Sequence, residues 1–414
     1  MQAEYAMQPA PPLWKNRDYI LLWSGQTVSI IGTQVSTIAF PLLVLALTNS
    51  PIQAGIVGAA RTLPYLLFTL PAGALVDRWD RKRVMIACNV ESGIALASVA
   101  FALLLGRITI AQIVIVSFLE GSASVFFGLA EAGALPQVVA KEQLSTAVAQ
   151  GQIQYSVGGI IGPPLGGALY SAAPLLPFAV DASSYAVAGL SLATVRTRLQ
   201  GVRDAARRSM RAEIGEGLVW LWRHPLIRFM AFLTGSLNIS TTGFVLIIVV
   251  LAKEQGVSSA LIGTIFAVSG VAGILGAFIG ASIQRRFSFG QAIVGVTWYV
   301  ALTYALYAVA GTPALLMVVV GLQMLLSPTY DIVQYTYRIA VIPDALQGRV
   351  NSVFRLISWG VRPVGFALTG LLLERAGGVT TVLIISGWLA LVALVTTFNR
   401  HVREAPALNA LPPQ

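Results

Sequence analysis

One short stretch decides the fold of this chain: Gly73-Ala74-Leu75-Val76-Asp77-Arg78-Trp79-Asp80-Arg81-Lys82-Arg83. Its last seven residues hold two acidic and four basic side chains, and long hydrophobic segments lie on both sides. The flanking segments could cross a bilayer, whereas this stretch could not, because charged side chains are costly in the hydrocarbon core. It therefore predicts a tight, charged turn between two membrane-spanning helices. The simpler alternative is a basic loop that only fixes topology.

Composition indicates that the chain is an integral membrane protein. Of 414 residues, 56% are hydrophobic and 11% are charged, whereas soluble proteins carry about 25% charged residues. The net charge of +10 does not imply nucleic acid, because the topology below gives the basic residues another role. Cys88 is the only cysteine, and His224 and His401 lie far apart, so we expect no disulfide and no metal site. We expect no cofactor either.

Twelve segments are long and apolar enough to span a membrane, at about 20 residues each. They are 18–47, 51–77, 82–106, 109–136, 145–171, 174–197, 226–252, 258–284, 289–311, 313–340, 348–375 and 378–399. The polar stretch 198–225 divides them into two sets of six. Leu218, Trp220 and Trp222 near its end predict an amphipathic helix on the membrane surface.

The two sets of segments resemble each other at an offset of about half the chain. Gly73 corresponds to Gly280, and Trp14 lies near the counterpart of Trp222. This predicts an all-α membrane protein with twelve transmembrane helices in two six-helix bundles related by a pseudo-two-fold axis. The expected parts are a cytoplasmic N-terminal arm at 1–17, bundles at 18–197 and 226–399, a cytoplasmic linker at 198–225 and a cytoplasmic tail at 400–414.

The distribution of basic residues predicts the orientation. Most Lys and Arg fall on the side that carries both termini, and the other side holds Arg107, Lys253 and Arg375. Because basic loops stay in the cytoplasm, both termini should be cytoplasmic in a multi-pass protein of the cell membrane.

The opening stretch resembles the loop between helices two and three of the major facilitator superfamily, a similarity that covers essentially the whole chain. Residues 158–167, with the sequence GGIIGPPLGG, look like that family's helix-five motif, which is associated with proton-driven exporters. Residues 343–351 and 177–181 are similar to a bacterial drug and siderophore exporter branch. The resemblance implies a gating role for the residues of these motifs: Gly73, Asp77, Arg78, Arg81, Gly158, Gly162, Pro163, Gly166, Gly167, Arg349 and Arg355.

Two parts of this gate have a more specific expectation. Glycines 158, 162 and 166 form one stripe on a helix that allows another helix to approach closely. By the resemblance, the partner would be the eighth segment, with Gly270, Gly273, Gly276 and Gly280. The resemblance also implies that Asp77 meets the start of helix eleven, near Gly348 and Arg349, when the cavity faces outward.

Ionisable residues inside the predicted segments are candidates for proton coupling, since they are costly there without a function. The candidates are Glu120, Glu131, Asp331, Glu91 and Asp181. Glu120 and Glu131 are about three turns apart on one face of a helix, so they could pass a proton along a cavity. The alternative is that each carboxyl forms a structural ion pair, for instance with Arg61 or Arg355. Glu131 and Thr33 depart from the family's pattern, so its proton site cannot be transferred directly.

The resemblance implies that segments one, four, seven and ten line a central cavity, and the polar and aromatic residues on them predict that this cavity is amphipathic and suits mid-sized hydrophobic compounds. They are Gln26, Gln34, Phe126, Phe127, Asn238, Thr241, Gln323, Tyr330, Gln334 and Tyr335. No Gly-Lys dipeptide occurs, so there is no Walker A loop for ATP, and we expect no enzyme.

The sequence therefore predicts a monomeric exporter of amphipathic small molecules, driven by proton antiport with alternating access. Its partners would be a small-molecule substrate, protons and the lipid bilayer. Two alternatives stay open: an uptake symporter or facilitator on the same fold, and a membrane receptor or assembly protein that transports nothing.

Overall fold

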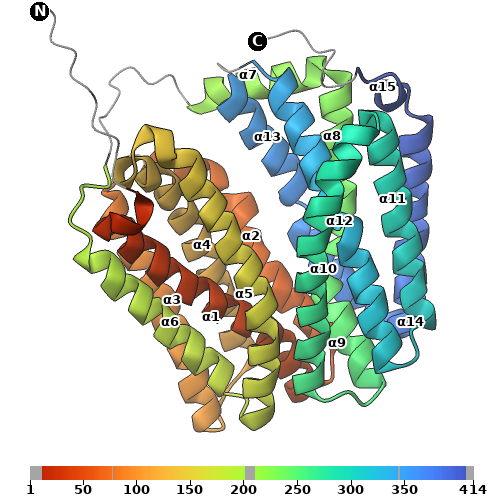
Figure 1. Cartoon of the computed structure of the whole chain (residues 1–414). Helices are drawn as coiled ribbons and strands as arrows, with labels where there is room; N and C mark the ends of the chain where they lie inside the picture. The colour runs from red at the N-terminus through yellow and green to blue at the C-terminus, as the bar shows by residue number, and fades with distance from the viewer. Residues whose placement is uncertain (1–11, 77, 201–209, 344–345, 407–414) are drawn as a thin grey trace, which may run out of the picture.

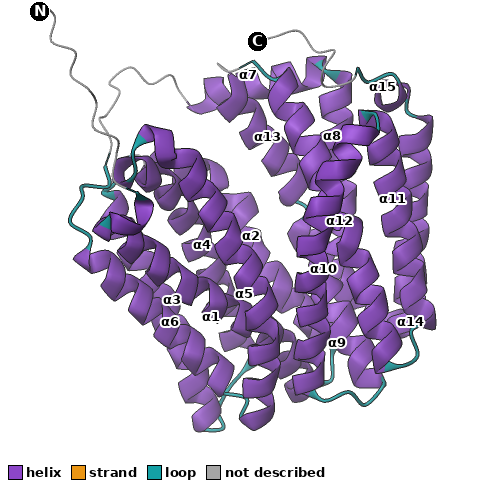
Figure 2. Cartoon of the chain, viewed as in Figure 1, coloured by secondary structure: helices purple, strands orange, loops and turns teal. Residues whose placement is uncertain are grey.

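The structure is a computed structural model that describes residues 12–76, 78–200, 210–343 and 346–406. Within these residues all regular secondary structure is helical (Figure 2). The helices form two bundles side by side, the first from red to yellow-green and the second from green to blue (Figure 1). Asp77 lies outside the described residues, so the predicted position of its carboxylate is not described either.

The first bundle contains six long helices. These are α1 (Arg17–Thr48), α2 (Pro51–Val76), α3 (Arg81–Leu104), α4 (Ile110–Val138), α5 (Leu144–Ala172) and α6 (Leu176–Thr194), with short 3-10 helices at Leu13–Lys15 and Lys141–Gln143. Helix α1 packs against α5 and α6, and α4 packs against α2 and α3.

The second bundle begins after a surface helix, α7 (Met210–Arg223). It contains α8 (Pro225–Thr241), α9 (Phe244–Glu254), α10 (Ser259–Arg286), α11 (Phe289–Leu306), a 3-10 turn at Tyr307–Val309, α12 (Pro313–Val341), α13 (Gln347–Trp359), α14 (Arg362–Phe398) and α15 (Arg400–Arg403). Helix α7 packs against α13 and α8, at the place predicted for the amphipathic helix.

Two predicted continuous spans are broken in the structure. The span predicted at 226–252 is divided into α8 and α9 at Gly243, where a side chain would collide with Thr369 of α14. The span predicted at 348–375 is divided after Trp359, because Pro363 lacks the N–H that a continuous helix would need there.

Twelve crossings follow from these helices. Among the described residues, nine helical stretches are long and apolar enough to cross a membrane, and Gln347–Phe398 is one of them. This stretch turns back at Gly377, whose φ of 78° is easily adopted only by glycine, and so supplies two crossings. Helices α2 and α5 have 26 and 29 residues and complete the predicted set.

Helix caps repeat at equivalent places in the two bundles. The Thr109 side chain accepts a hydrogen bond from the backbone at the start of α4, and Thr312 does the same at the start of α12. Likewise Asp80 caps α3 and Ser288 caps α11. Capping side chains fix where a helix begins. Shared caps therefore support the predicted duplication at the level of single residues.

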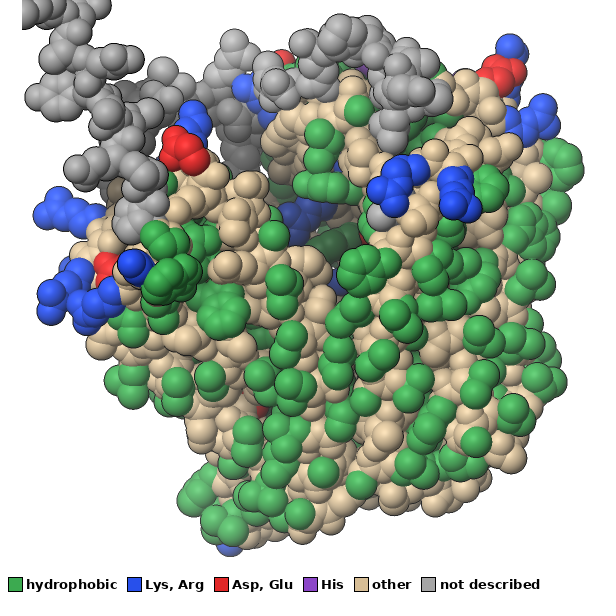
Figure 3. All heavy atoms as spheres, viewed as in Figure 1, with side chains coloured by type: hydrophobic (Ala, Val, Ile, Leu, Met, Phe, Trp, Pro, Cys, Tyr) green, Lys and Arg blue, Asp and Glu red, His purple; other side chains and the backbone are tan. Residues whose placement is uncertain are grey.

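Lys and Arg side chains gather at one end of the molecule, which carries α7, α15 and the turn between α2 and α3 (Figure 3). We call this the basic end. Hydrophobic side chains are spread over the visible flank, as expected for a surface that faces lipid (Figure 3).

The predicted contact between α5 and α10 is confirmed, and Gly270 of α10 packs against Gly159 and Ile160 of α5, but the face of α5 predicted to make this contact was wrong. Gly158, Gly162 and Gly166 of α5 face α1, where a Cβ atom at Gly158 would lie 2.7 Å from Ile30 and one at Gly166 would lie 3.1 Å from the Val35 Cα. The adjacent face of α5, one residue further along, contacts α10 instead. A glycine spacing identifies a helix face that permits close approach, but it does not identify the neighbour.

Two glycine pairs join the bundles at the end opposite the basic end. A Cβ atom at Gly167 of α5 would lie 3.0 Å from the Cα of Gly263 on α10. A Cβ atom at Gly370 of α14 would lie 3.0 Å from the Cα of Gly55 on α2. Of the four predicted partners, Gly276 and Gly280 instead pack against α12. The halves therefore meet through two similar backbone contacts, which we call the α5–α10 seam and the α2–α14 seam.

Candidate functional site

A hollow lies between the two bundles and opens toward the basic end (Figure 3). One part, of about 420 Å³, is lined mainly by the first bundle, and another, of about 370 Å³, by the second. We call these the N-side cavity and the C-side cavity. Arg362 lines both of them, so they adjoin at the middle of the molecule. A third space of about 260 Å³ shares Gln26, Ile30 and Tyr155 with the N-side cavity.

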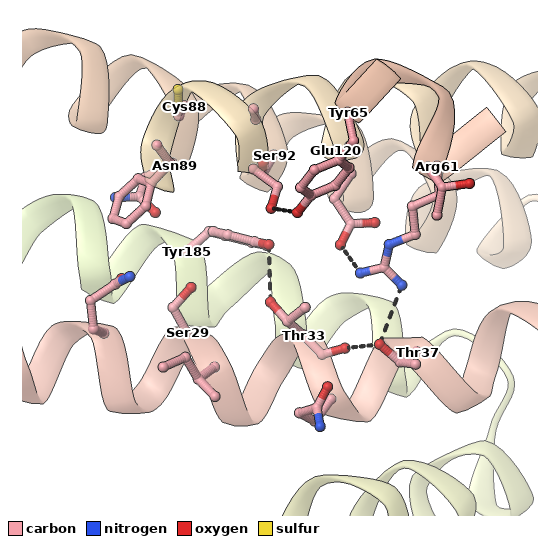
Figure 4. A pocket seen from close by; sticks show the side chains of 18 of the residues that line it. Ser29, Thr33, Thr37, Arg61, Tyr65, Cys88, Asn89, Ser92, Glu120 and Tyr185 are labelled. Atoms are coloured by element: carbon pink, nitrogen blue, oxygen red, sulfur yellow. Dashed lines mark hydrogen bonds and ion pairs between the residues drawn. The ribbon is translucent and has the colours of Figure 1, made fainter. Parts of the chain in front are cut away.

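A buried ion pair lies on the wall of the N-side cavity. Arg61 of α2 donates a hydrogen bond of 2.6 Å to the Glu120 carboxylate of α4, and a second one of 3.2 Å to Thr37 of α1 (Figure 4). The Glu120 side chain is 2% exposed. Gly121 brings α2 and α4 together, because a side chain there would collide with the Arg61 carbonyl. Removing either partner would leave the other charge buried and unpaired.

Asp181 of α6 is a second carboxyl group near the same guanidinium. Its side chain is completely buried, and it accepts a 3.2 Å hydrogen bond from Ser184 while its Oδ2 atom has no partner among the described residues. It interacts electrostatically with both Arg61 and Glu120. Gly32 of α1 provides the space, since a Cβ atom there would lie 2.7 Å from Asp181 Oδ1.

These groups form a charge-unbalanced cluster of Arg61, Glu120 and Asp181. One guanidinium cannot neutralise two carboxylates, and a buried carboxylate without a partner is strongly disfavoured. The cluster can therefore hold one proton on a carboxyl group. Tyr185 lies beside it, with its hydroxyl 3.0 Å from Thr33 (Figure 4).

The other two acidic candidates of the first bundle lie elsewhere. Glu131 lines the third space, nearer the basic end, with Gln26 within hydrogen-bonding reach. Glu120 and Glu131 thus lie on adjoining spaces at different depths, as their spacing indicated. Glu91 of α3 is half-buried and is not among the residues that line the three spaces.

The C-side cavity has a different charge pattern. Asp331 of α12 is exposed on its wall, and among the described residues no Lys or Arg nitrogen lies within 4 Å of its carboxylate. Arg362 donates a long hydrogen bond of 3.4 Å to Asn238. Tyr330 is held by a 2.7 Å hydrogen bond with Thr234.

Seven of the ten predicted cavity residues line these spaces. They are Gln26, Gln34 and Phe127 on the first bundle, and Asn238, Thr241, Gln323 and Tyr330 on the second. Phe126 instead stacks on Trp79, and Gln334 accepts a 3.2 Å hydrogen bond from Arg338. Tyr335 is 52% exposed and lies beside Arg338.

Several of the predicted gating residues contact other described residues. Arg81 donates a 2.7 Å hydrogen bond to the Gly133 carbonyl of α4, while Arg78 is exposed. Arg349, at the start of α13, forms a 2.6 Å ion pair with Glu216 of α7. At Gly73 a side chain would meet nothing within 4 Å. Arg355 lies against the Trp359 ring.

Some site residues were missed at the sequence level. Tyr65, Tyr155 and Tyr185 line the N-side cavity, but single tyrosines in apolar segments give no distinctive signal. Glu374, shortly before the turn of α14 at Gly377, was also missed. Its carboxylate accepts hydrogen bonds from the Ser50 hydroxyl and, at 2.9 Å, from the Ile52 N–H at the start of α2. It therefore caps a helix of the other bundle.

Comparison with known protein families gives one match, the Major Facilitator Superfamily, over residues 22–294. Among sequence relatives, the multidrug efflux pump Tap of Mycolicibacterium fortuitum is 27% identical over 93% of this chain and 96% of its own length. Macrolide efflux protein A of Streptococcus pyogenes is 29% identical over 46% of this chain and 47% of its own length.

Solved transporter structures share the fold. The nucleoside transporter NupG superposes with a TM-score of 0.76 over 94% of this chain and all of its own, at 15% identity. A bacterial homologue of the iron transporter ferroportin, solved in an inward-facing state, gives a TM-score of 0.74 over 92% of this chain and 98% of its own, at 18% identity. At such identities the likeness concerns the fold alone.

Proposed function

Because the chain belongs to the major facilitator superfamily, we propose that it exports amphipathic small molecules through the cell membrane by proton antiport. The observation that carries the proposal is a cavity lined by both bundles, with an unbalanced cluster of Arg61, Glu120 and Asp181 on its wall. Relatives named for multidrug and macrolide efflux support export over uptake and an assembly role.

Orientation follows from the basic end. Loops rich in Lys and Arg remain on the cytoplasmic side of a membrane, so the basic end and both chain termini face the cytoplasm in this proposal. The hollow then opens to the cytoplasm, where an exporter collects its substrate. One chain supplies both cavity walls, so a monomer is sufficient for transport.

Proton coupling is assigned to the cluster on the first bundle. With Glu120 held by Arg61 at 2.6 Å, Asp181 is the less well paired carboxyl and is the group that gains or loses the proton. When Asp181 is charged, it competes with Glu120 for the guanidinium and pulls on α2, α4 and α6 together. Protonation removes this competition. Glu131, beside the entrance, is the next candidate for the proton path.

Alternating access uses the two glycine seams. They close the cavity at the end opposite the basic end, and their backbone contacts can separate without breaking buried ion pairs. Opening both seams while closing the basic end would expose the same cavity to the other side of the membrane.

Transport in proteoliposomes tests the proposal, with ethidium and Hoechst 33342 as amphipathic probes. We expect dye movement out of the compartment that faces the basic end, dependent on a proton gradient and abolished by a protonophore. Glu120→Gln and Asp181→Asn should abolish the gradient dependence, whereas Glu91→Gln, a carboxyl outside the cavities, serves as the matched control.

Three results would contradict parts of this proposal. Gradient-driven efflux that survives Glu120→Gln, Asp181→Asn and Glu131→Gln would remove the coupling assignment. Gradient-driven movement in the opposite direction would favour the uptake transporter. No flux and no stabilisation by any dye would favour a receptor or assembly role.

A further inference from the structure

We propose that Arg362, together with Arg355 and Trp359, forms a subsite for the acidic group of an aromatic or amphipathic substrate. The inference rests on the proposed export function and defines one chemical class that the cavity accepts. It concerns the second bundle, which the proton-coupling cluster does not use.

The position of Arg362 is central. Its side chain lines both the N-side and the C-side cavity, so it borders the space between the bundles at their midpoint. It begins α14 immediately after the break that follows Trp359. A group bound at Arg362 therefore lies at the junction between the two bundles.

The guanidinium of Arg362 has unused binding capacity. It offers five N–H donors, but its only hydrogen bond with a described residue is the 3.4 Å contact with Asn238. Its Nε atom is buried and has no partner among the described residues. No described carboxylate lies within 4 Å of it. An intramembrane guanidinium without a counter-charge is costly, so an anionic group on the substrate would supply what the protein does not.

Aromatic rings next to Arg362 indicate that the ligand also carries an aromatic ring system. The guanidinium carbons of Arg355 and Arg362 lie 4.7 Å and 4.5 Å from the Trp359 ring centre. The Tyr65 ring of the first bundle lies 6.4 Å from the same ring. Two aromatic rings in an edge-to-face arrangement beside two cations suit a conjugated molecule that carries a carboxylate, since carboxylates bind arginine through two parallel hydrogen bonds.

Asp331 is the group that could compete with such a ligand. It lines the C-side cavity with Arg362 and interacts electrostatically with Arg362 and Arg338, but at a distance greater than an ion pair. Its negative charge should therefore weaken the binding of an anionic ligand. This gives two substitutions of opposite expected sign: Arg362→Gln removes attraction, and Asp331→Asn removes repulsion.

Equilibrium binding of two matched dyes tests the subsite. Rhodamine 110 carries a carboxylate, and rhodamine 123 is its methyl ester, so the cationic ring system is common to both. Binding is measured by fluorescence anisotropy on the full chain in nanodiscs without a proton gradient, with empty nanodiscs subtracted. This readout does not depend on proton coupling, so the subsite can fail while the efflux proposal stands, and the reverse.

We expect wild-type protein to bind rhodamine 110 about tenfold more tightly than rhodamine 123, a typical effect of one charge-assisted contact. Arg362→Gln should abolish the preference, Arg355→Gln should reduce it, and Asp331→Asn should increase it. Arg107→Gln, an exposed arginine at the end opposite the basic end, should leave it unchanged.

Other results would overturn the subsite. These are equal or tighter binding of the methyl ester by the wild type, a preference that persists in Arg362→Gln, or no saturable binding of either dye. If Arg362→Gln does not fold, as judged by gel filtration and thermal unfolding, the Asp331→Asn result decides, and an unchanged preference there rejects the proposal.

Discussion

Arg61 of the first bundle and Arg362 of the second both line the cavity, and these two arginines have opposite surroundings. Arg61 of the first bundle has the Glu120 carboxylate at 2.6 Å and a second carboxyl, Asp181, nearby. Arg362 of the second bundle has no described carboxylate within 4 Å and one long contact with Asn238. Both side chains line the N-side cavity.

This difference shows how two bundles of the same architecture can have different roles in one protein. The two seams are alike, with Gly167 against Gly263 and Gly370 against Gly55, whereas the charged residues that line the cavity differ between the two bundles. The buried cluster of the first bundle has two carboxyls, Glu120 and Asp181, and one cation, Arg61, which suits proton binding. The second bundle leaves a cation unsatisfied, which suits a substrate anion. Four sets of variants test this difference between the bundles.

Arg61→Gln should have the largest effect. It leaves Glu120 buried without its cation, which for a buried pair costs about 3 to 5 kcal/mol of folding free energy. Thermal unfolding should reveal this loss, and gradient-driven efflux should disappear. The double variant Arg61→Gln/Glu120→Gln should recover most of the stability but no coupling. If the single variant is as stable as wild type, the ion pair of Arg61 and Glu120 does not contribute to the stability of the fold.

Gly167→Leu and Gly370→Leu should have the next largest effects, and these should be similar to each other. Each side chain enters a backbone contact where a Cβ atom would already lie 3.0 Å from a Cα atom, and overpacking of this kind costs about 1 to 3 kcal/mol. The cavity should open more often at the end opposite the basic end. Distance measurements between spin labels on the two bundles would detect this. Gly295→Leu, where a side chain meets nothing within 4 Å, is the control.

Asn238→Asp places a carboxylate beside Arg362. The arginine of the second bundle then has a carboxylate partner, as Arg61 has in the first bundle. Rhodamine 110 should then bind about tenfold more weakly, while rhodamine 123 should bind at least as well. The variant gives up the 2.7 Å hydrogen bond from Asn238 to the Ser358 carbonyl, so its stability needs to be checked in parallel. Unchanged rhodamine 110 binding would show that Arg362 does not select acidic ligands.

Glu374→Gln should have the smallest effect. Glu374 caps α2 across the α2–α14 seam, with contacts to Ser50 and Ile52, and the α5–α10 seam has no such carboxylate among its described contacts. Because the site is exposed and screened, we expect about a twofold fall in the population closed at that end. The same spin-label distances would report it. A change as large as that of Gly370→Leu would mean that the cap dominates the seam.

Most of the fold could be predicted from residue patterns. Hydrophobic length predicted the spans, and the distribution of basic residues predicted a topology. The capping side chains at helix starts, such as Thr109 and Thr312, were identified only in the structure. The divisions at Gly243 and before Pro363 were missed, since one glycine or proline in an apolar run is compatible with a continuous membrane helix.

The site was predictable only as a set of residue types. Intramembrane charge identified Glu120, Asp181 and Asp331 as candidates, and an ion pair with Arg61 was one open alternative for the glutamate. The predicted contact of α5 with α10 was right, but the stripe of Gly158, Gly162 and Gly166 faces α1 instead, because helical spacing describes one helix and does not show which of its faces meets which neighbour.

The sequence by itself determined that this chain lies in a membrane, how many times it crosses and which residues are too costly there to lack a role. These are properties of single segments, because each depends on the free energy of transferring that segment's residues from water to lipid. Only the tertiary structure decided that Arg61 is paired and Arg362 is not, and that α5 meets α10 through Gly167. Pairing depends on distances of a few ångströms between helices far apart in the chain, and packing alone fixes those distances.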